Sequence, residues 1–65
     1  MKLRATLKDY HFNGKTLFGK IYDDQAGRFE DGKLVVTSSV IKIDEDWGEA
    51  ETKHTKYKLV NKAGS

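Results

Sequence analysis

The chain has no cysteine, so neither a disulfide nor a cysteine-ligated zinc ion can staple its fold. It has no apolar run near the roughly 20 residues that a bilayer span needs. Its first residues alternate apolar with charged side chains, unlike a secretory signal. These absences predict a cytoplasmic protein of one small domain that does not contact a membrane. Its core must come from aliphatic and aromatic side chains, or from self-association.

An excess of charge of one sign is also missing. Charged residues make up 34% of the 65 residues, yet the net charge is only +2. This balance is too even to indicate nucleic-acid binding by itself. The charges are segregated, however, because residues 23–51 carry nine acidic against three basic side chains, while residues 1–22 and 52–65 are predominantly basic.

The first eight residues alternate strictly, with apolar side chains at the odd positions. This period of two predicts a half-buried strand. Tyr10 and Phe12 shift the apolar set to even positions, and one extra residue near Lys8-Asp9 would repair the parity. We therefore expect a β-bulge there. The alternative places Tyr10 and Phe12 on the outer face of the strand.

Asn13-Gly14 is a strong hairpin signal, because both central residues of a type I′ turn need positive φ. A two-residue turn at this site would place Phe12 opposite Lys15. Further turn signals recur at intervals of 8–12 residues, and no helical stripe is present. The segments expected to form strands after the turn are 15–22, 34–37 and 40–43, followed by one or two final strands over 50–55 and 56–60.

This pattern predicts an all-β fold, namely a small antiparallel barrel of five or six strands over residues 1–60. An SH3-like barrel fits the length best, and an OB-like barrel is the alternative. Residues 61–65 are expected to form a flexible tail. The side chains expected in the core are Leu3, Leu7, Phe18, Ile21, Phe29, Val36, Ile43 and Tyr57.

Trp47 stands apart because it lies in an acidic turn, where it is expected to be partly exposed. An exposed tryptophan can anchor an interface, and the alternative is that it caps one end of the barrel. The candidate interface comprises Trp47, Asp44, Asp46 and Glu49. The candidate basic face comprises Lys2, Arg4, Lys8, Lys56 and Lys58. Both sets also fit ordinary solvated surfaces, where lysines protect strand edges.

The sequence lacks the residue spacings that catalytic, cofactor-binding and metal-binding sites require. Gly14-Lys15-Thr16 resembles the end of a P-loop, but the motif needs a glycine where Asp9 stands. The acidic turn lacks the spacing of an EF-hand. Nothing in the spacing of His11 and His54 brings either of them to a nucleophile. We predict no catalytic residue, no metal site and no cofactor.

The segment Gly27-Arg28-Phe29-Glu30-Asp31-Gly32, followed by Val36-Thr37-Ser38 and closing on Tyr57-Lys58-Leu59, carries a family resemblance. It resembles small uncharacterised proteins encoded by phages and mobile elements of bacteria, over roughly residues 19–60. The resemblance implies a compact β-barrel and a bacterial or phage source, and it implies no catalytic residues.

The sequence thus predicts a non-enzymatic binding module, either a protein-interaction or accessory factor with an unknown protein partner or a self-associating domain. The alternative is a small β-barrel that binds nucleic acid through the basic first and last strands. Such binding would weaken steeply with salt, because phosphate contacts dominate it.

Overall fold

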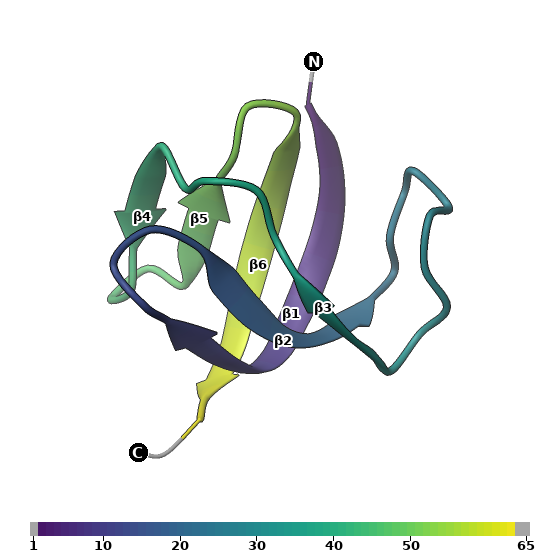
Figure 1. Ribbon diagram of the computed structural model, residues 1–65, viewed down its shortest axis with the longest axis horizontal. Helices are drawn as coiled ribbons and strands as arrows, with labels where there is room; N and C mark the ends of the chain where they lie inside the picture. Colours follow the sequence, from purple (N-terminus) through teal and green to yellow (C-terminus); the bar gives the residue numbers. More distant parts are fainter. Residues whose placement is uncertain (1, 64–65) are drawn as a thin grey trace.

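A computed structural model describes residues 2–63, and that range contains six strands and no helix. The strands are β1 (Leu3–Phe12), β2 (Leu17–Tyr22), β3 (Lys33–Val36), β4 (Lys42–Asp44), β5 (Glu49–Glu51) and β6 (Thr55–Lys62). They form one sheet in the order β3-β2-β1-β6-β5-β4. The sheet curls, so that β2 and β3 cross in front of β1 and β6 in Figure 1. The prediction of an all-β fold is confirmed.

The prediction of an antiparallel barrel needs two corrections. β1 and β6 run parallel, whereas the other neighbouring strands are antiparallel. The sheet is also open, because β3 and β4 are its two edges. The cause lies in the connection between β3 and β4, which crosses from one side of the curled sheet to the other. At its start the Thr37 N–H donates to the Leu17 carbonyl of β2 at 2.8 Å, and at its end the Ile41 N–H donates to the Glu51 carbonyl of β5 at 2.8 Å. Hydrophobic alternation reports which face a residue occupies and not the direction of its strand.

The β-bulge in β1 is confirmed. The register of β1 against β2 shifts between Lys8 and His11, and Asp9 adopts a φ of 52°. Gly19 faces this irregularity, and a Cβ on it would lie 2.9 Å from the Lys8 carbonyl oxygen and 3.0 Å from the Tyr10 Cα. The bulge therefore requires a glycine across from it. Because of the bulge, Leu7 and Tyr10 are both buried, although strict alternation along a strand would place an odd-numbered and an even-numbered residue on opposite faces.

The hairpin after β1 is wider than a two-residue turn. Phe12 pairs with Leu17 and not with Lys15, so residues 13–16 form the connection. The Asn13 side-chain oxygen accepts the N–H groups of Lys15 at 2.9 Å and Thr16 at 2.7 Å. These hydrogen bonds stabilise the longer loop, which is a local use of asparagine that competes with the tight turn.

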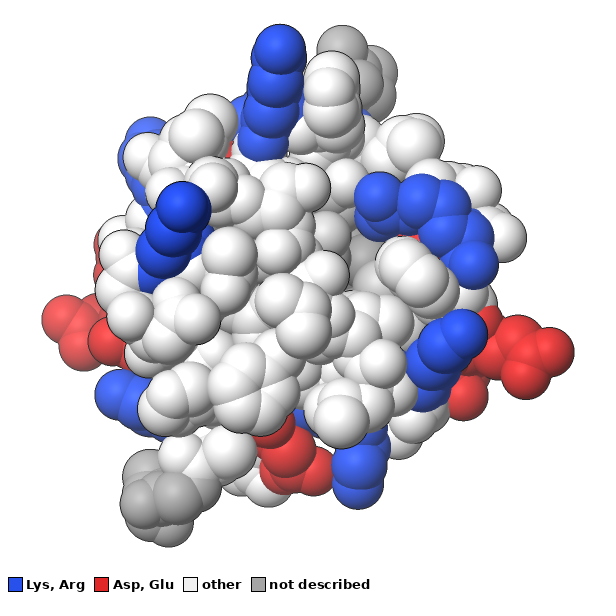
Figure 2. Space-filling view, viewed as in Figure 1, with Lys and Arg blue, Asp and Glu red and all other residues white. Residues whose placement is uncertain are grey.

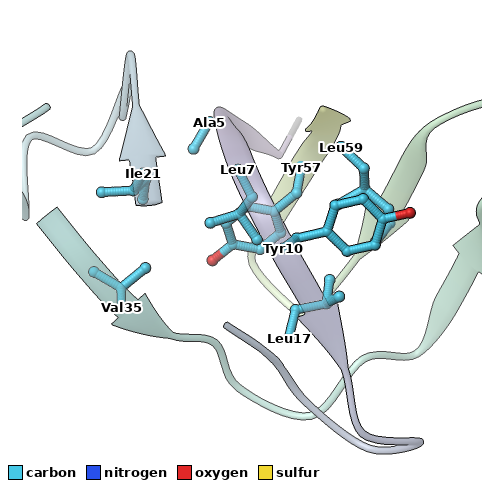
Figure 3. Close-up of a cluster of buried hydrophobic side chains, with 9 residues drawn as sticks. Ala5, Leu7, Tyr10, Leu17, Ile21, Val35, Tyr57 and Leu59 are labelled. Atoms are coloured by element: carbon cyan, nitrogen blue, oxygen red, sulfur yellow. The ribbon is translucent and has the colours of Figure 1, made fainter. Parts of the chain in front are cut away.

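One cluster of nine buried apolar side chains forms the core, drawn from both layers of the curled sheet (Figure 3). The members are Ala5, Leu7, Tyr10, Leu17, Ile21, Val35, Ala50, Tyr57 and Leu59. The core positions of Leu7, Ile21 and Tyr57 are confirmed, and Ile43 packs against the cluster while partly buried. No buried side-chain nitrogen or oxygen in residues 2–63 lacks a hydrogen-bond partner.

Four predicted core residues are exposed instead: Leu3 at 45%, Phe18 and Phe29 at 37%, and Val36 at 70%. The inward positions of β2 are Leu17, Gly19 and Ile21, so Phe18 points outward. Val35 takes the inward position of β3, which turns Val36 to solvent. Phe29 lies in a loop, with the charged ends of Arg28 and Lys33 over its ring.

At the C-terminal end, β6 extends to Lys62, two residues into the segment expected as a tail. Gly64 and Ser65, which complete that segment, lie outside the described residues. Within residues 2–63 no helix is long and apolar enough to cross a membrane.

Candidate binding groove

The outer face of the parallel β1–β6 pair forms the floor of a groove of about 490 Å³. Because side chains alternate along a strand, the even-numbered residues of both strands face outward here. Arg4 pairs with Lys56 and Thr6 with Lys58, which brings basic side chains of both chain ends onto one surface. The groove is lined by Arg4, Ala5, Thr6, Asp23, Gln25, Trp47, Gly48, Glu49, Lys56, Tyr57 and Lys58.

One wall is the turn between β4 and β5, which carries Trp47. Asp44 Oδ1 accepts the Trp47 N–H at 3.0 Å, and the Gly48 carbonyl accepts the Leu59 N–H at 2.8 Å. Gly48 has a φ of 77°, a left-handed conformation that glycine adopts without steric cost. These contacts fix the turn against β6, while the Trp47 side chain remains 77% exposed.

The same turn is also tied to the core. The Tyr10 hydroxyl donates to Glu45 Oε1 at 3.3 Å, and Lys62 Nζ lies 3.3 Å from the same oxygen. Burial, together with the adjacent Glu45 carboxylate, raises the pKa of Tyr10 above its usual value, so the hydroxyl stays protonated and able to donate. The position of Trp47 is therefore set by bonds on both sides of the turn.

The opposite wall is the loop after β2. The Gln25 N–H donates to the Arg4 carbonyl at 2.9 Å, and the Arg4 N–H donates to Gln25 Oε1 at 2.9 Å. Asp23, which also lines the groove, has a φ of 53°. The loop thus continues the sheet beside the first three residues of β1, 3–5, which have no strand partner on that side among the described residues.

A nearly buried carboxylate stabilises this loop from within. The Asp24 side chain is 1% exposed and accepts the N–H groups of Ala26 at 3.2 Å and Arg28 at 3.0 Å, while Arg28 Nε lies 3.4 Å away. Burial alone would raise the pKa of Asp24, but the Arg28 and backbone hydrogen bonds outweigh it and lower that pKa. Arg28 in turn donates to Thr55 Oγ1 at 3.4 Å, which joins the loop to the start of β6.

The basic side chains in and beside the groove differ in how far their charge is neutralised, and Lys2 is beside the groove without lining it. Lys2 and Lys56 lie 3.0 and 3.8 Å from Glu51 carboxylate oxygens. The Lys2 hydrogen bond lowers the pKa of Glu51, which keeps this carboxylate charged. Within residues 2–63, by contrast, the side chains of Arg4 and Lys58 form no ion pair. These two cations are available to a ligand.

The structure merges parts of the two predicted surfaces. Trp47 and Glu49 from the acidic set line the groove together with Arg4, Lys56 and Lys58 from the basic set. The remaining residues lie elsewhere. Asp44 orders the turn and lines a smaller hollow, Asp46 is exposed in the turn, Lys2 binds Glu51, and Lys8 lies over the Tyr22 ring at 4.5 Å.

Sequence reasoning missed Asp23 and Gln25. The only available signal was the polar turn itself, which reveals neither its distance from β1 nor the paired hydrogen bonds to Arg4. The histidines lie outside the groove. The His11 ring packs against Phe18 with centroids 5.1 Å apart, and His54 is exposed between β5 and β6. Across residues 2–63 no group of three or more His, Asp or Glu side chains is placed to hold a metal ion.

Comparison with known proteins found no matching family model, no similar curated protein and no similar solved structure.

Proposed function

We propose that the protein is a non-enzymatic protein-interaction module, and that its groove across β1 and β6 holds an extended acidic segment of a partner protein. The observation that carries this proposal is the position of Trp47, which is 77% exposed at the rim of a groove whose floor presents basic side chains. A large apolar ring left in water is unfavourable for a monomer, and tryptophan is among the residue types enriched at the positions that dominate binding energy in interfaces.

The composition of the groove favours a peptide as its ligand. Arg4 and Lys58 offer two cations to acidic side chains, and Arg4 can bind a carboxylate with two parallel hydrogen bonds. Trp47 offers an apolar surface to a neighbouring side chain of the same ligand. Asp23 and Glu49 can accept hydrogen bonds from the N–H groups of an extended peptide, which are donors that a phosphate backbone lacks.

Single-stranded nucleic acid is the second candidate ligand. It is favoured by the same juxtaposition of Trp47 with Arg4, Lys56 and Lys58, because bases stack on exposed aromatic rings beside cations. It is the weaker candidate because Trp47 is the one strongly exposed aromatic side chain of the groove. Stacking on a single ring contributes about 1–3 kcal/mol.

The test uses the single tryptophan of the chain as its reporter. We expect Trp47 emission to shift to shorter wavelength and to resist iodide quenching when short acidic peptides with one aromatic residue are titrated in. A basic peptide of equal length should have no effect. Lys58→Glu should weaken the binding about tenfold or more, since a charge-assisted contact becomes a repulsion.

Lys53→Glu is the matched control, because Lys53 is exposed between β5 and β6 and does not line the groove. It should bind like the wild type. Unchanged Trp47 emission with every acidic peptide would overturn the proposal. A response to oligothymidylate alone, lost as salt is raised, would establish the second candidate in its place.

The more specific predictions of fold type, biological source and cellular location are part of the same proposal. A short-stranded sheet that curls around one core, with a groove on its outer face, supports an SH3-like binding domain. A bacterial or phage source and a cytoplasmic location stay predictions from the sequence.

A further inference from the structure

β3 is an edge of the sheet, and its outer side has no strand partner among residues 2–63. The Thr37 N–H donates toward β2, to the Leu17 carbonyl at 2.8 Å. In an antiparallel ladder, successive residues direct their backbone groups alternately to opposite sides. The backbone groups of Val35 and the carbonyl of Lys33 therefore point toward β2, while the Lys33 N–H donates to the Glu30 carbonyl at 3.2 Å. The backbone groups of Leu34 and Val36 point away from the sheet.

The same two residues also expose their side chains. Leu34 is 66% and Val36 is 70% exposed, and Phe18, opposite Val36 on β2, is 37% exposed. The His11 ring continues this apolar row onto β1. Figure 2 shows that the face over β2 and β3 is uncharged at its centre, with lysine, arginine and acidic side chains around the rim.

Few of the usual protections of an edge strand are present. β3 contains no proline and one charged residue, Lys33 at its first position. An edge with free backbone groups and apolar side chains at the same residues is a template for pairing with another strand. Since the outward-directed residues are Leu34 and Val36, the template is symmetrical about Val35.

We propose that the protein forms a two-fold dimer in which β3 pairs antiparallel with β3 of a second copy, centred on Val35. Leu34 then faces Val36 of the second copy, and each such pair exchanges both of its outward backbone hydrogen bonds. On the outer face, Phe18 and Val36 of one copy meet Leu34 of the other, which makes one continuous apolar cluster.

The charges suit this pairing with an identical chain. Lys33 falls opposite Thr37 of the second copy, so the two Lys33 side chains are four residues out of register and do not oppose each other. Lys20, next to Leu34 on β2, falls at the far ends of the joined rows. No like charges are brought face to face in this register.

The available area sets the strength of the dimer. A stable specific interface buries about 800 Å² on each partner, and the surface of this chain is 4554 Å². A strand of four residues with two exposed apolar side chains, next to Phe18 on β2, covers well below that area. We therefore expect a dissociation constant of about 0.1–1 mM, typical of weak, transient association.

Sedimentation equilibrium over a range from about 20 μM to 2 mM spans the expected dissociation constant. The weight-average mass of the wild type should rise from 7.4 kDa toward twice that value. Val36→Lys should stay monomeric. Ile41→Lys is the matched control, because Ile41 is 65% exposed but lies outside β3, and it should dimerise like the wild type.

Amide hydrogen exchange provides a second readout that specifies the register. The N–H groups of Leu34 and Val36 should become protected as the concentration rises, and those of β4 should not change. Leu34→Lys repeats the test if Val36→Lys fails to fold by circular dichroism. A wild-type mass of 7.4 kDa throughout, or a Val36→Lys variant that still dimerises, would overturn the proposal. The dimer is independent of the groove, so Trp47→Ala should leave it unchanged.

Discussion

The absence of a Cβ atom at Gly19 allows β1 and β2 to approach closely at the bulge. A methyl group here would meet the Lys8 carbonyl oxygen at 2.9 Å and the Tyr10 Cα at 3.0 Å, and both are backbone atoms that cannot rotate away. The bulge at Asp9 and the close approach of Gly19 are therefore two parts of one arrangement. Without them, Leu7 and Tyr10 could not both point inward.

Gly19→Ala should consequently lower the free energy of unfolding by about 2–3 kcal/mol, the usual cost of forcing extra volume into a packed site. Urea unfolding followed by circular dichroism measures this change. Lys20→Ala is the neighbouring control, and an exposed position should cost less than about 1 kcal/mol. Equal stability of Gly19→Ala and the wild type would show that β1 and β2 have room at the bulge.

Asp24 gives the fold a defined sensitivity to acid. Its folded-state pKa is lower than in the unfolded chain, so its carboxylate stabilises the fold above about pH 4. That contribution is lost as the pH falls through the folded-state pKa. Asp24→Asn should therefore lower stability at pH 7 by about 1–3 kcal/mol and flatten the decline in stability below pH 4. Thermal melts at a series of pH values measure both effects.

Asp46→Asn supplies the control, because Asp46 is exposed in the turn between β4 and β5, and this variant should keep the wild-type stability at pH 7. An Asp24→Asn variant as stable as the wild type, with the same acid profile, would mean that the Asp24 hydrogen bonds contribute nothing to the fold.

For the individual strands, the sequence of β1 shows which side chains face the core, whereas the sequence of β3 does not. The bulge could be predicted because the apolar set changes parity between Leu7 and Tyr10, and only an extra residue reconciles the two. Val35 and Val36 carry no such signal, because both are apolar and either parity satisfies the pattern. The same ambiguity between Leu17 and Phe18 explains why Phe18 was assigned to the core.

Paired substitutions separate the two faces of β3. Val35→Ala should cost about 2 kcal/mol in unfolding free energy, from the buried methyl groups removed and the cavity left behind. Val36→Ala should change stability by less than about 0.5 kcal/mol in dilute solution. Chemical denaturation of both variants decides the register. Costs in the reverse order would place Val36 in the core and remove the exposed edge.

For the whole molecule, the strand order could not be read from the sequence. The parallel pairing of β1 and β6 depends on how residues 37–41 cross between distant strands, and no local pattern encodes that path. This pairing has the largest functional consequence, because it gathers Arg4, Lys56 and Lys58 beside Trp47. Five of the lining residues, Arg4, Trp47, Glu49, Lys56 and Lys58, are candidates from the sequence, but the sequence does not predict that they lie on one surface.

The molecule then presents two unlike surfaces on different strands: a charged groove over β1 and β6, and an apolar edge at β3. We propose that the first binds an acidic segment of another protein and that the second pairs with a copy of the chain. A dimer of this kind would carry two grooves, and a partner with two acidic segments would bind it more tightly than a partner with one.

Backbone and indole N–H chemical shifts, recorded while an acidic peptide is added to dilute 15N-labelled protein, test the groove most directly. We expect shift changes at the Trp47 indole N–H and along the facing halves of β1 and β6, with β3 unaffected. Changes confined to β2 and β3, or no change at the Trp47 indole at saturating peptide, would contradict this expectation.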